Sequence, residues 1–180
     1  RCKLIKDLSI AIVSKKVILE SYPVSLRIIN LFLFHQKHHI KDKLVIKSLL
    51  LQINFLENNL EYHLLGNHLL ENIFSLFIAG HFLKNKALIK KSTNLILKEL
   101  DEQILNDGAH YECSPMYHSV ILSKLCLSIE VARQGGYLSP EELIFLNNKA
   151  SIMFSWLDSY SFPDGSWALF NDSALGMSAG

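Results

Sequence analysis

The chain has 180 residues, 49% of them hydrophobic, and a formal net charge of +1 with a pI of about 7.9. This length and apolar content are enough for one sizeable core that needs no disulfide or metal to hold it together. The balanced charge excludes a strong overall field for nucleic acid, so an anionic polymer would have to be attracted locally.

Apolar residues recur at helical spacing along almost the whole chain, and the short breaks contain Gly, Pro, Asn or Asp. Ser114-Pro115 and Ser139-Pro140 predict two helix starts, because Ser caps a helix well and Pro suits its first position. Gly135-Gly136 predicts a helix end. The predicted helices cover residues 4–17 (the weakest pattern), 22–37, 42–62, 66–83, 87–105, 115–133 and 140–159.

These helices and their short connections predict an all-α fold of antiparallel helical hairpins, closed as a bundle or curled into an (α/α) toroid. No segment combines strand alternation with hairpin turns, and no internal repeat is evident. No apolar run predicts a membrane span. The chain begins with Arg and ends with NDSALGMSAG, which resembles the start of another element, so we expect a segment of a longer protein.

Reversal of direction at each connection predicts that one end of the array collects the starts of the 22–37, 66–83 and 115–133 helices. The loop after residue 159 would lie at the same end. These segments hold many polar and aromatic groups that a core does not require: Tyr22-Pro23, Arg27, Gly66-Asn67-His68, residues 106–118 and residues 162–172.

A polar stripe marks the start of the 66–83 helix. On a helical wheel, Asn67, His68, Glu71, Asn72 and Ser75 fall within an arc of about 140°. In one interpretation Asn67 caps the helix while Glu71 and Asn72 are solvated. In the other, the stripe faces a groove, with Asn67 and His68 directed at a ligand.

Tyr117 and His118 fall in the first turn of the helix that Ser114-Pro115 begins. Free backbone N–H groups and the positive end of the helix dipole favour anions there and would help a phenol to ionise. Tyr117 is therefore a candidate for proton transfer. The alternative is a half-buried aromatic with its hydroxyl on a backbone group, and a structural role for His118.

Other chemical motifs are missing or weak. HExxH, GxGxxG and GxxxxGK[ST] do not occur, and the three cysteines form no CxxC pair, so no metal site or cofactor is expected in this segment. Asp107-Gly108 and Asp164-Gly165 are typical of turns. The cluster from His35 to Lys43 is interpreted as a solvated basic surface.

Four motifs in order resemble the helical N-terminal domain of the heparinase II/III family and its alginate lyase relatives. They are SYPVSLRIIN (21–30), HLLGNHLLEN (63–72), DGAHYECSPMYH (107–118) and FPDGSWALFND (162–172). The resemblance covers residues 20–178 and implies part of an (α/α) toroid. It also implies a C-terminal β-sandwich domain, absent from this segment, with the polysaccharide bound between the two.

The resemblance implies a polysaccharide lyase that cleaves uronic-acid-containing glycans by β-elimination. By motif, Asn67 and His68 would neutralise the uronate carboxylate, and Tyr117 would act as general acid and also as base. Glu71, Arg27 and His118 would bind substrate. A further histidine would come from beyond residue 180.

Other functions stay open at this point. The same scaffold could be a non-catalytic glycan-binding or surface-polysaccharide assembly module, or a purely structural helical domain. The expected partner is an acidic polysaccharide, without nucleic acid. The resemblance favours a periplasmic or extracellular location and leaves a cytoplasmic one open.

Overall fold

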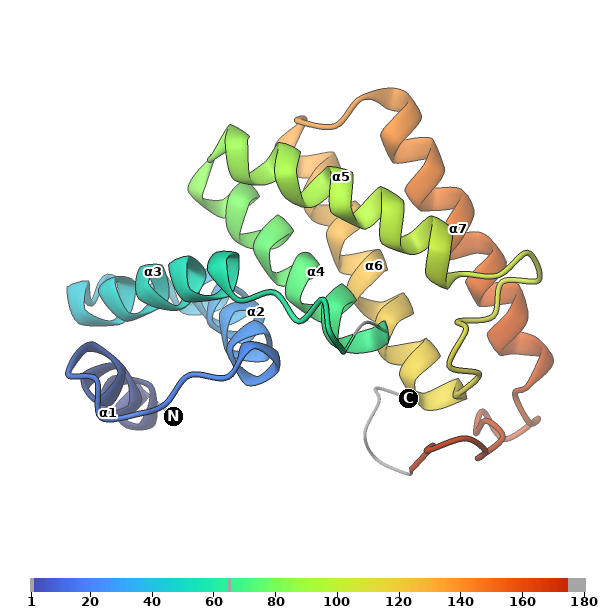
Figure 1. The fold of residues 1–180 in the computed structure, drawn as a ribbon, viewed down its shortest axis with the longest axis horizontal. Coiled ribbons are helices and arrows are strands. Elements are labelled where there is room, and N and C mark those ends of the chain that lie inside the picture. Colours follow the sequence, from blue (N-terminus) through green and yellow to red (C-terminus); the bar gives the residue numbers. More distant parts are fainter. Residues whose placement is uncertain (1, 65, 175–180) are drawn as a thin grey trace.

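The computed structural model describes residues 2–64 and 66–174, which are helical apart from connecting loops (Figure 1). The predicted all-α class is confirmed, since the described part holds only two isolated bridges and no extended strand. None of the described helices is long and apolar enough to cross a lipid bilayer. The helices are α1 (Cys2–Val13), α2 (Ser21–His38), α3 (Lys43–Asn58), α4 (Gly66–Leu83), α5 (Lys86–Gln103), α6 (Pro115–Gly135) and α7 (Pro140–Ser159). The further element expected at the end of the chain falls largely on residues 175–180, outside the described ranges.

The predicted capping signals are confirmed. Ser114 and Ser139 accept hydrogen bonds from backbone N–H groups of the first turns of α6 and α7, and each is followed by proline. Glu142 completes a capping box with Ser139. Gly136 ends α6 in the left-handed conformation, with φ of 66°, where a glycine costs least.

Two helices end earlier than predicted. α1 stops at Val13 instead of residue 17, and α3 stops at Asn58 instead of residue 62. At the end of α3, Asn58 and Asn59 turn their side-chain amides back onto carbonyls one turn earlier. The backbone N–H of Glu61 donates to Asn72 on α4 at 3.0 Å, which draws the chain out of the helix. Helical periodicity cannot reveal such a tertiary contact.

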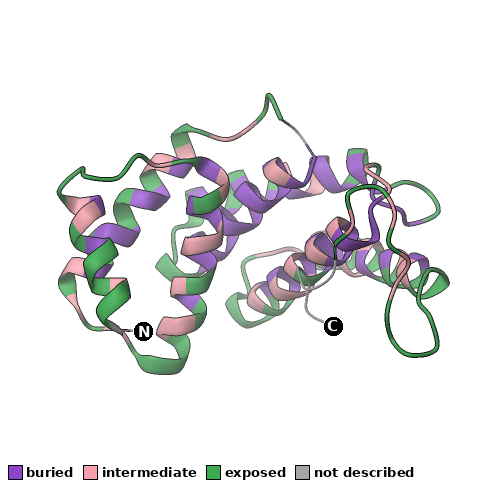
Figure 2. Ribbon diagram, turned by 90° about the horizontal axis from the view of Figure 1, so that it is seen from below, coloured by how far each residue is buried: buried purple, intermediate pink, exposed green. Residues whose placement is uncertain are grey.

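α4 is the central helix and packs against α2, α3, α5 and α6. From Gly66 to His81 nearly every residue is buried, as the continuous purple stretch in Figure 2 shows. A helix that is mostly apolar around its circumference belongs in such a position. The interpretation of Glu71 and Asn72 as solvated is therefore wrong, because they are 2% and 0% exposed.

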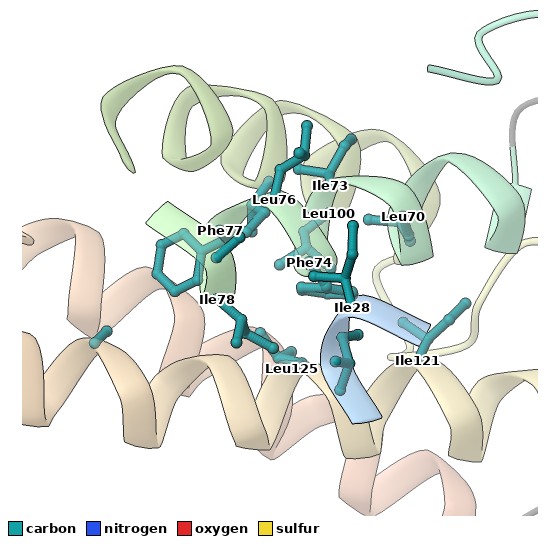
Figure 3. Packing of buried hydrophobic residues seen from close by; sticks show 14 of the residues in the cluster. Ile28, Leu70, Ile73, Phe74, Leu76, Phe77, Ile78, Leu100, Ile121 and Leu125 are labelled. Atoms are coloured by element: carbon teal, nitrogen blue, oxygen red, sulfur yellow. The ribbon is translucent and has the colours of Figure 1, made fainter. Parts of the chain in front are cut away.

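The core forms around α4. Phe74 and Phe77 are fully buried, and Ile28 from α2, Leu100 from α5 and Leu125 from α6 surround them (Figure 3). Full burial of each such side chain contributes about 1.5–3 kcal/mol. This packing fixes the relative positions of α2, α4 and α6.

The helices form antiparallel hairpins in two layers. α2, α4 and α6 point the same way, and each is followed by a helix that returns, so α3, α5 and α7 run back on the outer side (Figure 1). The starts of α4 and α6 and the segment after α7 lie along the lower edge of that view. Closure of the hairpins into a toroid stays a prediction.

The loops after α5 and α7 share one local structure that no sequence repeat reveals. In each, an Asp-Gly turn is closed by an isolated bridge, Ile104 with His110 and Ser161 with Trp167. The Asp107 and Asp164 side chains accept from backbone N–H groups two residues later, so their predicted turn role is confirmed.

Candidate active site

The predicted meeting of helix starts is confirmed. We call this region the shared end: the first two turns of α2, α4 and α6 with loops 59–64, 104–114 and 160–174. The Tyr22 ring on α2 stacks on the His68 ring on α4, with centroids 4.4 Å apart. Ser173, after α7, lies 3.0 Å from the hydroxyl of Ser114 at the start of α6.

Asn67 is held by a carboxylate from the loop before α6. Its backbone N–H donates to Glu112 Oε1 at 3.0 Å, and its side-chain Nδ2 donates to Glu112 Oε2 at 3.1 Å. Gly66 makes this approach possible: its φ is +53°, and a Cβ added there would lie 2.0 Å from Glu112 Oε1. Only glycine satisfies both the backbone conformation and the space.

His68 is held by a second carboxylate. Its Nδ1 lies 3.4 Å from Glu61 Oε1, and about two fifths of its side chain is exposed. The fully buried Asn72 fixes Glu61, because its Nδ2 donates to Glu61 Oε2 at 2.9 Å and to Ser25 Oγ at 3.0 Å. Within the described part of the chain, no protein group bonds to Nε2 of His68, so that edge of the ring is left for a ligand.

Tyr117 lies in the first turn of α6 and is half-buried. Its backbone N–H donates to the Ser114 cap at 3.4 Å. Burial raises the pKa of the Tyr22 phenol, and acidic neighbours raise it further: Glu71, Tyr117, Glu61 and Glu112. Tyr117 lies at the start of α6, the helix that packs against α4.

Glu71 lies one turn below Asn67 and joins α4 to α6. Its Oε1 is 3.7 Å from Lys124 Nζ, an ion pair too long for a hydrogen bond. Burial raises the pKa of the Glu71 carboxyl, and Lys124 partly opposes that rise. The pair lies between the helices that carry Asn67 and Tyr117.

Two residues expected to bind substrate face elsewhere. Arg27 Nε donates to Gln52 on α3 at 2.9 Å, and Arg27 lines a cavity of about 330 Å³ between α1, α2 and α3. His118 is 0% exposed and turns toward α7, where its Nε2 meets the carbonyl of Met153 at 2.9 Å. Neither residue is kept in the candidate site, because one packs on other helices and the other has no free nitrogen.

His118 instead supports loop 104–114 through a buried hydrogen-bond chain. The backbone N–H of His110 donates to His118 Nδ1 at 3.2 Å, and that of Glu112 meets His110 Nδ1 at 3.4 Å. His110 Nε2 therefore carries the proton and donates to Gln103 at 3.0 Å. Burial lowers the pKa of His110 to about 3, with a contribution from His118. Both rings are neutral and hold the loop that presents Glu112.

The shared end thus carries both hydrogen-bond donors and phenols. The Asn67 amide, the His68 ring and the Tyr22 and Tyr117 phenols can bind an anionic, hydroxyl-rich ligand and exchange protons with it. Among the residues that the structure describes, no three His, Cys, Asp or Glu side chains lie close enough to hold a metal ion. Sequence reasoning missed the supporting roles of Glu61 and Glu112, although both lie inside or beside the quoted motifs.

Comparison with known proteins gives consistent matches. A family described as Heparinase II/III N-terminus matches residues 23–179. The heparin-sulfate lyase of Bacteroides stercoris is 29% identical over 120 residues, which make up 63% of this chain and 18% of that protein.

Two solved structures share the fold. A crystal structure of heparinase III has a TM-score of 0.68 at 18% identity, over 83% of this chain and 25% of that one. The heparan sulfate lyase HepC from Pedobacter heparinus has a TM-score of 0.61 at 18% identity, over 84% and 25%. The chain thus spans between 18% and 25% of the length of these relatives. Because the family match covers most of its residues, the chain belongs to the heparinase II/III family, as the four motifs indicate.

Proposed function

We propose that the whole protein containing this chain is a polysaccharide lyase that cleaves an acidic, uronic-acid-containing glycan by β-elimination. The observation that carries the proposal is that Asn67 and His68 at the start of α4, Tyr117 at the start of α6, and the Tyr22 ring that stacks on His68 all belong to the shared end. The named relatives act on heparin or heparan sulfate, which supports an acidic polymer as substrate.

Removal of the C5 proton of a uronate is difficult because the neighbouring carboxylate is already negative. Donors that neutralise this carboxylate stabilise the extra charge as it develops. Asn67 can give the second hydrogen of its Nδ2, since the first points to Glu112. His68 turns Nδ1 to the Glu61 carboxylate, which only accepts, so its Nε2 donates to the substrate when the imidazole is protonated. The contacts with Glu112 and Glu61 hold both side chains in place before a substrate binds.

Tyr117 is proposed to move the protons. The C5 proton leaves, the electron pair forms the C4–C5 double bond, the C4–O4 bond breaks and O4 is protonated. A tyrosine near both atoms can give the proton to O4 and can also accept the C5 proton. A histidine from the rest of the protein is expected to share this task.

Tyr117→Phe in the whole protein tests the assignment. The protein is incubated with a panel of uronate polymers, and the ultraviolet absorbance of the new double bond is followed. We expect the variant to lose turnover while its thermal unfolding stays close to that of the original protein. Tyr137→Phe, beyond the far end of α6, is the matched control and should keep full activity.

Asn67→Ala provides a second test. Loss of one donor to a developing negative charge should lower kcat by about 10²- to 10³-fold. Unchanged turnover in either site variant would refute the residue assignment. Binding of the polymer without any double-bond formation by the original protein would instead favour a non-catalytic glycan-binding module.

A further inference from the structure

The Asn67 side chain has a defined orientation because of the group it faces. A carboxylate only accepts hydrogen bonds, so the atom 3.1 Å from Glu112 Oε2 must be the amide nitrogen. The amide oxygen on the other side is shielded from solvent and has no donor among the described residues. The contact with Glu112 therefore determines which end of the amide is available.

Glu112 cannot easily change its own position. One carboxylate oxygen accepts from the Asn67 backbone N–H, which has a fixed direction at the start of α4. The loop behind Glu112 is held by its N–H on His110, and the space in front exists because Gly66 has no side chain. Three separate features thus hold this carboxylate against Asn67.

We propose that Glu112 is a positioning residue that presents the donor end of the Asn67 amide to the substrate carboxylate. The inference rests on the proposed lyase function. A rotated amide would place its oxygen beside the substrate carboxylate and repel it, so the same side chain would oppose the reaction it is proposed to assist. Glu112 acts through Asn67 and needs no contact with the sugar.

Glu112→Gln separates orientation from simple support. The Asn67 backbone N–H still requires an acceptor, so the Gln oxygen should take that position and its NH₂ should face the side chain of Asn67. The Asn67 amide should then rotate and turn its oxygen to the NH₂ group. The variant keeps two hydrogen bonds and much of its stability. Its kcat should fall by about 10²-fold or more, comparable to loss of the donor.

Glu112→Ala distinguishes a positioning role of Glu112 from a purely structural one. It removes both hydrogen bonds, so it should be the less stable variant, yet its amide is free to rotate and should retain more turnover than Glu112→Gln. The expected order of kcat is therefore opposite to the order of stability. If Glu112 only supported the fold, the less stable variant would also have the lower kcat.

The double variant Asn67→Asp with Glu112→Gln restores a matched pair, because the Gln NH₂ can donate to the new carboxylate. We expect stability close to that of the original protein and no turnover. Glu130→Gln, far from the shared end, should leave activity unchanged. If activity follows stability across the set, or if Glu112→Gln keeps full kcat, the positioning role is overturned. A different result would overturn the proposed function: the original protein forms no unsaturated product on any polymer.

Discussion

Gly66→Ala probes the contact between α4 and Glu112 through a single methyl group. Two costs add. Alanine at the left-handed φ of +53° costs about 1–2 kcal/mol. The new Cβ would lie 2.0 Å from Glu112 Oε1, so the carboxylate must move and release the Asn67 backbone and side chain.

Hydrogen bonds to a charged group contribute about 1.5–3 kcal/mol each, and the lower value suits the partly exposed Glu112. We expect the free energy of unfolding to fall by about 4–5 kcal/mol. Turnover should fall as well, since the Asn67 amide loses its partner. Urea unfolding followed by the helical circular dichroism signal gives the first quantity, and double-bond absorbance gives the second.

Gly136→Ala is the matched control. Gly136 has a similar φ of +66°, but no heavy atom lies within 4 Å of an added Cβ. This variant should show only the backbone cost of about 1–2 kcal/mol and keep its activity. Equal losses of stability in the two variants would show that the Glu112 contact contributes nothing, and the reasoning about Asn67 would fail with it.

Two further predictions concern buried charge. His110 has a folded pKa of about 3, below its ordinary 6.5, so the unfolded chain binds a proton first as the pH falls. The free energy of unfolding should therefore drop by up to about 1.4 kcal/mol per pH unit between roughly pH 6.5 and 3, and His110→Gln should flatten that part of a urea-unfolding series. Lys124→Met leaves Glu71, which is 2% exposed, without its partner and should cost about 3 kcal/mol at neutral pH. Part of that loss should return as the pH falls and Glu71 is protonated, because its pKa in the folded variant lies above that of the unfolded chain. Lys91→Met, whose partner Glu57 keeps 38% of its side chain exposed, should change stability by no more than about 0.5 kcal/mol in the same assay. A similar loss in both lysine variants would contradict the argument.

The helices could be predicted from the sequence because the interactions that define them are local. Apolar periodicity and the Ser-Pro caps at residues 114 and 139 depend on neighbours a few positions away, and they located α6 and α7 to within two residues. The end of α3 depends instead on Asn72, which takes the backbone N–H of Glu61. No local pattern encodes that contact, so the predicted helix was too long.

The candidate site could also be predicted only in part. Helix direction alone predicts that Asn67, His68 and Tyr117 share one end of the molecule. The partners of these groups come from loops whose path depends on unusual backbone angles, such as φ of 51° at Cys113 and 53° at Gly66. The burial of His118 also depends on such a loop, because the His110 backbone occupies its Nδ1.

A buried helix that carries Asn67, His68, Glu71 and Asn72 is costly, because an unpaired buried polar group costs about 1–3 kcal/mol. Among the described residues, Asn67 Oδ1 and Glu71 Oε1 accept no hydrogen bond, but each of the four side chains has at least one polar or charged neighbour. In this chain the partners come from four different segments: Glu112, Glu61, Ser25 and Lys124. Each contact ties the start of α4 to a different neighbour, so the first two turns of α4 cannot rotate or shift without breaking several contacts at once. Donors held in this way need little reorganisation when negative charge develops beside them, which is the condition under which electrostatic stabilisation is strongest. The same contacts that make polar residues tolerable in an apolar helix are therefore the ones that would make the helix useful for catalysis.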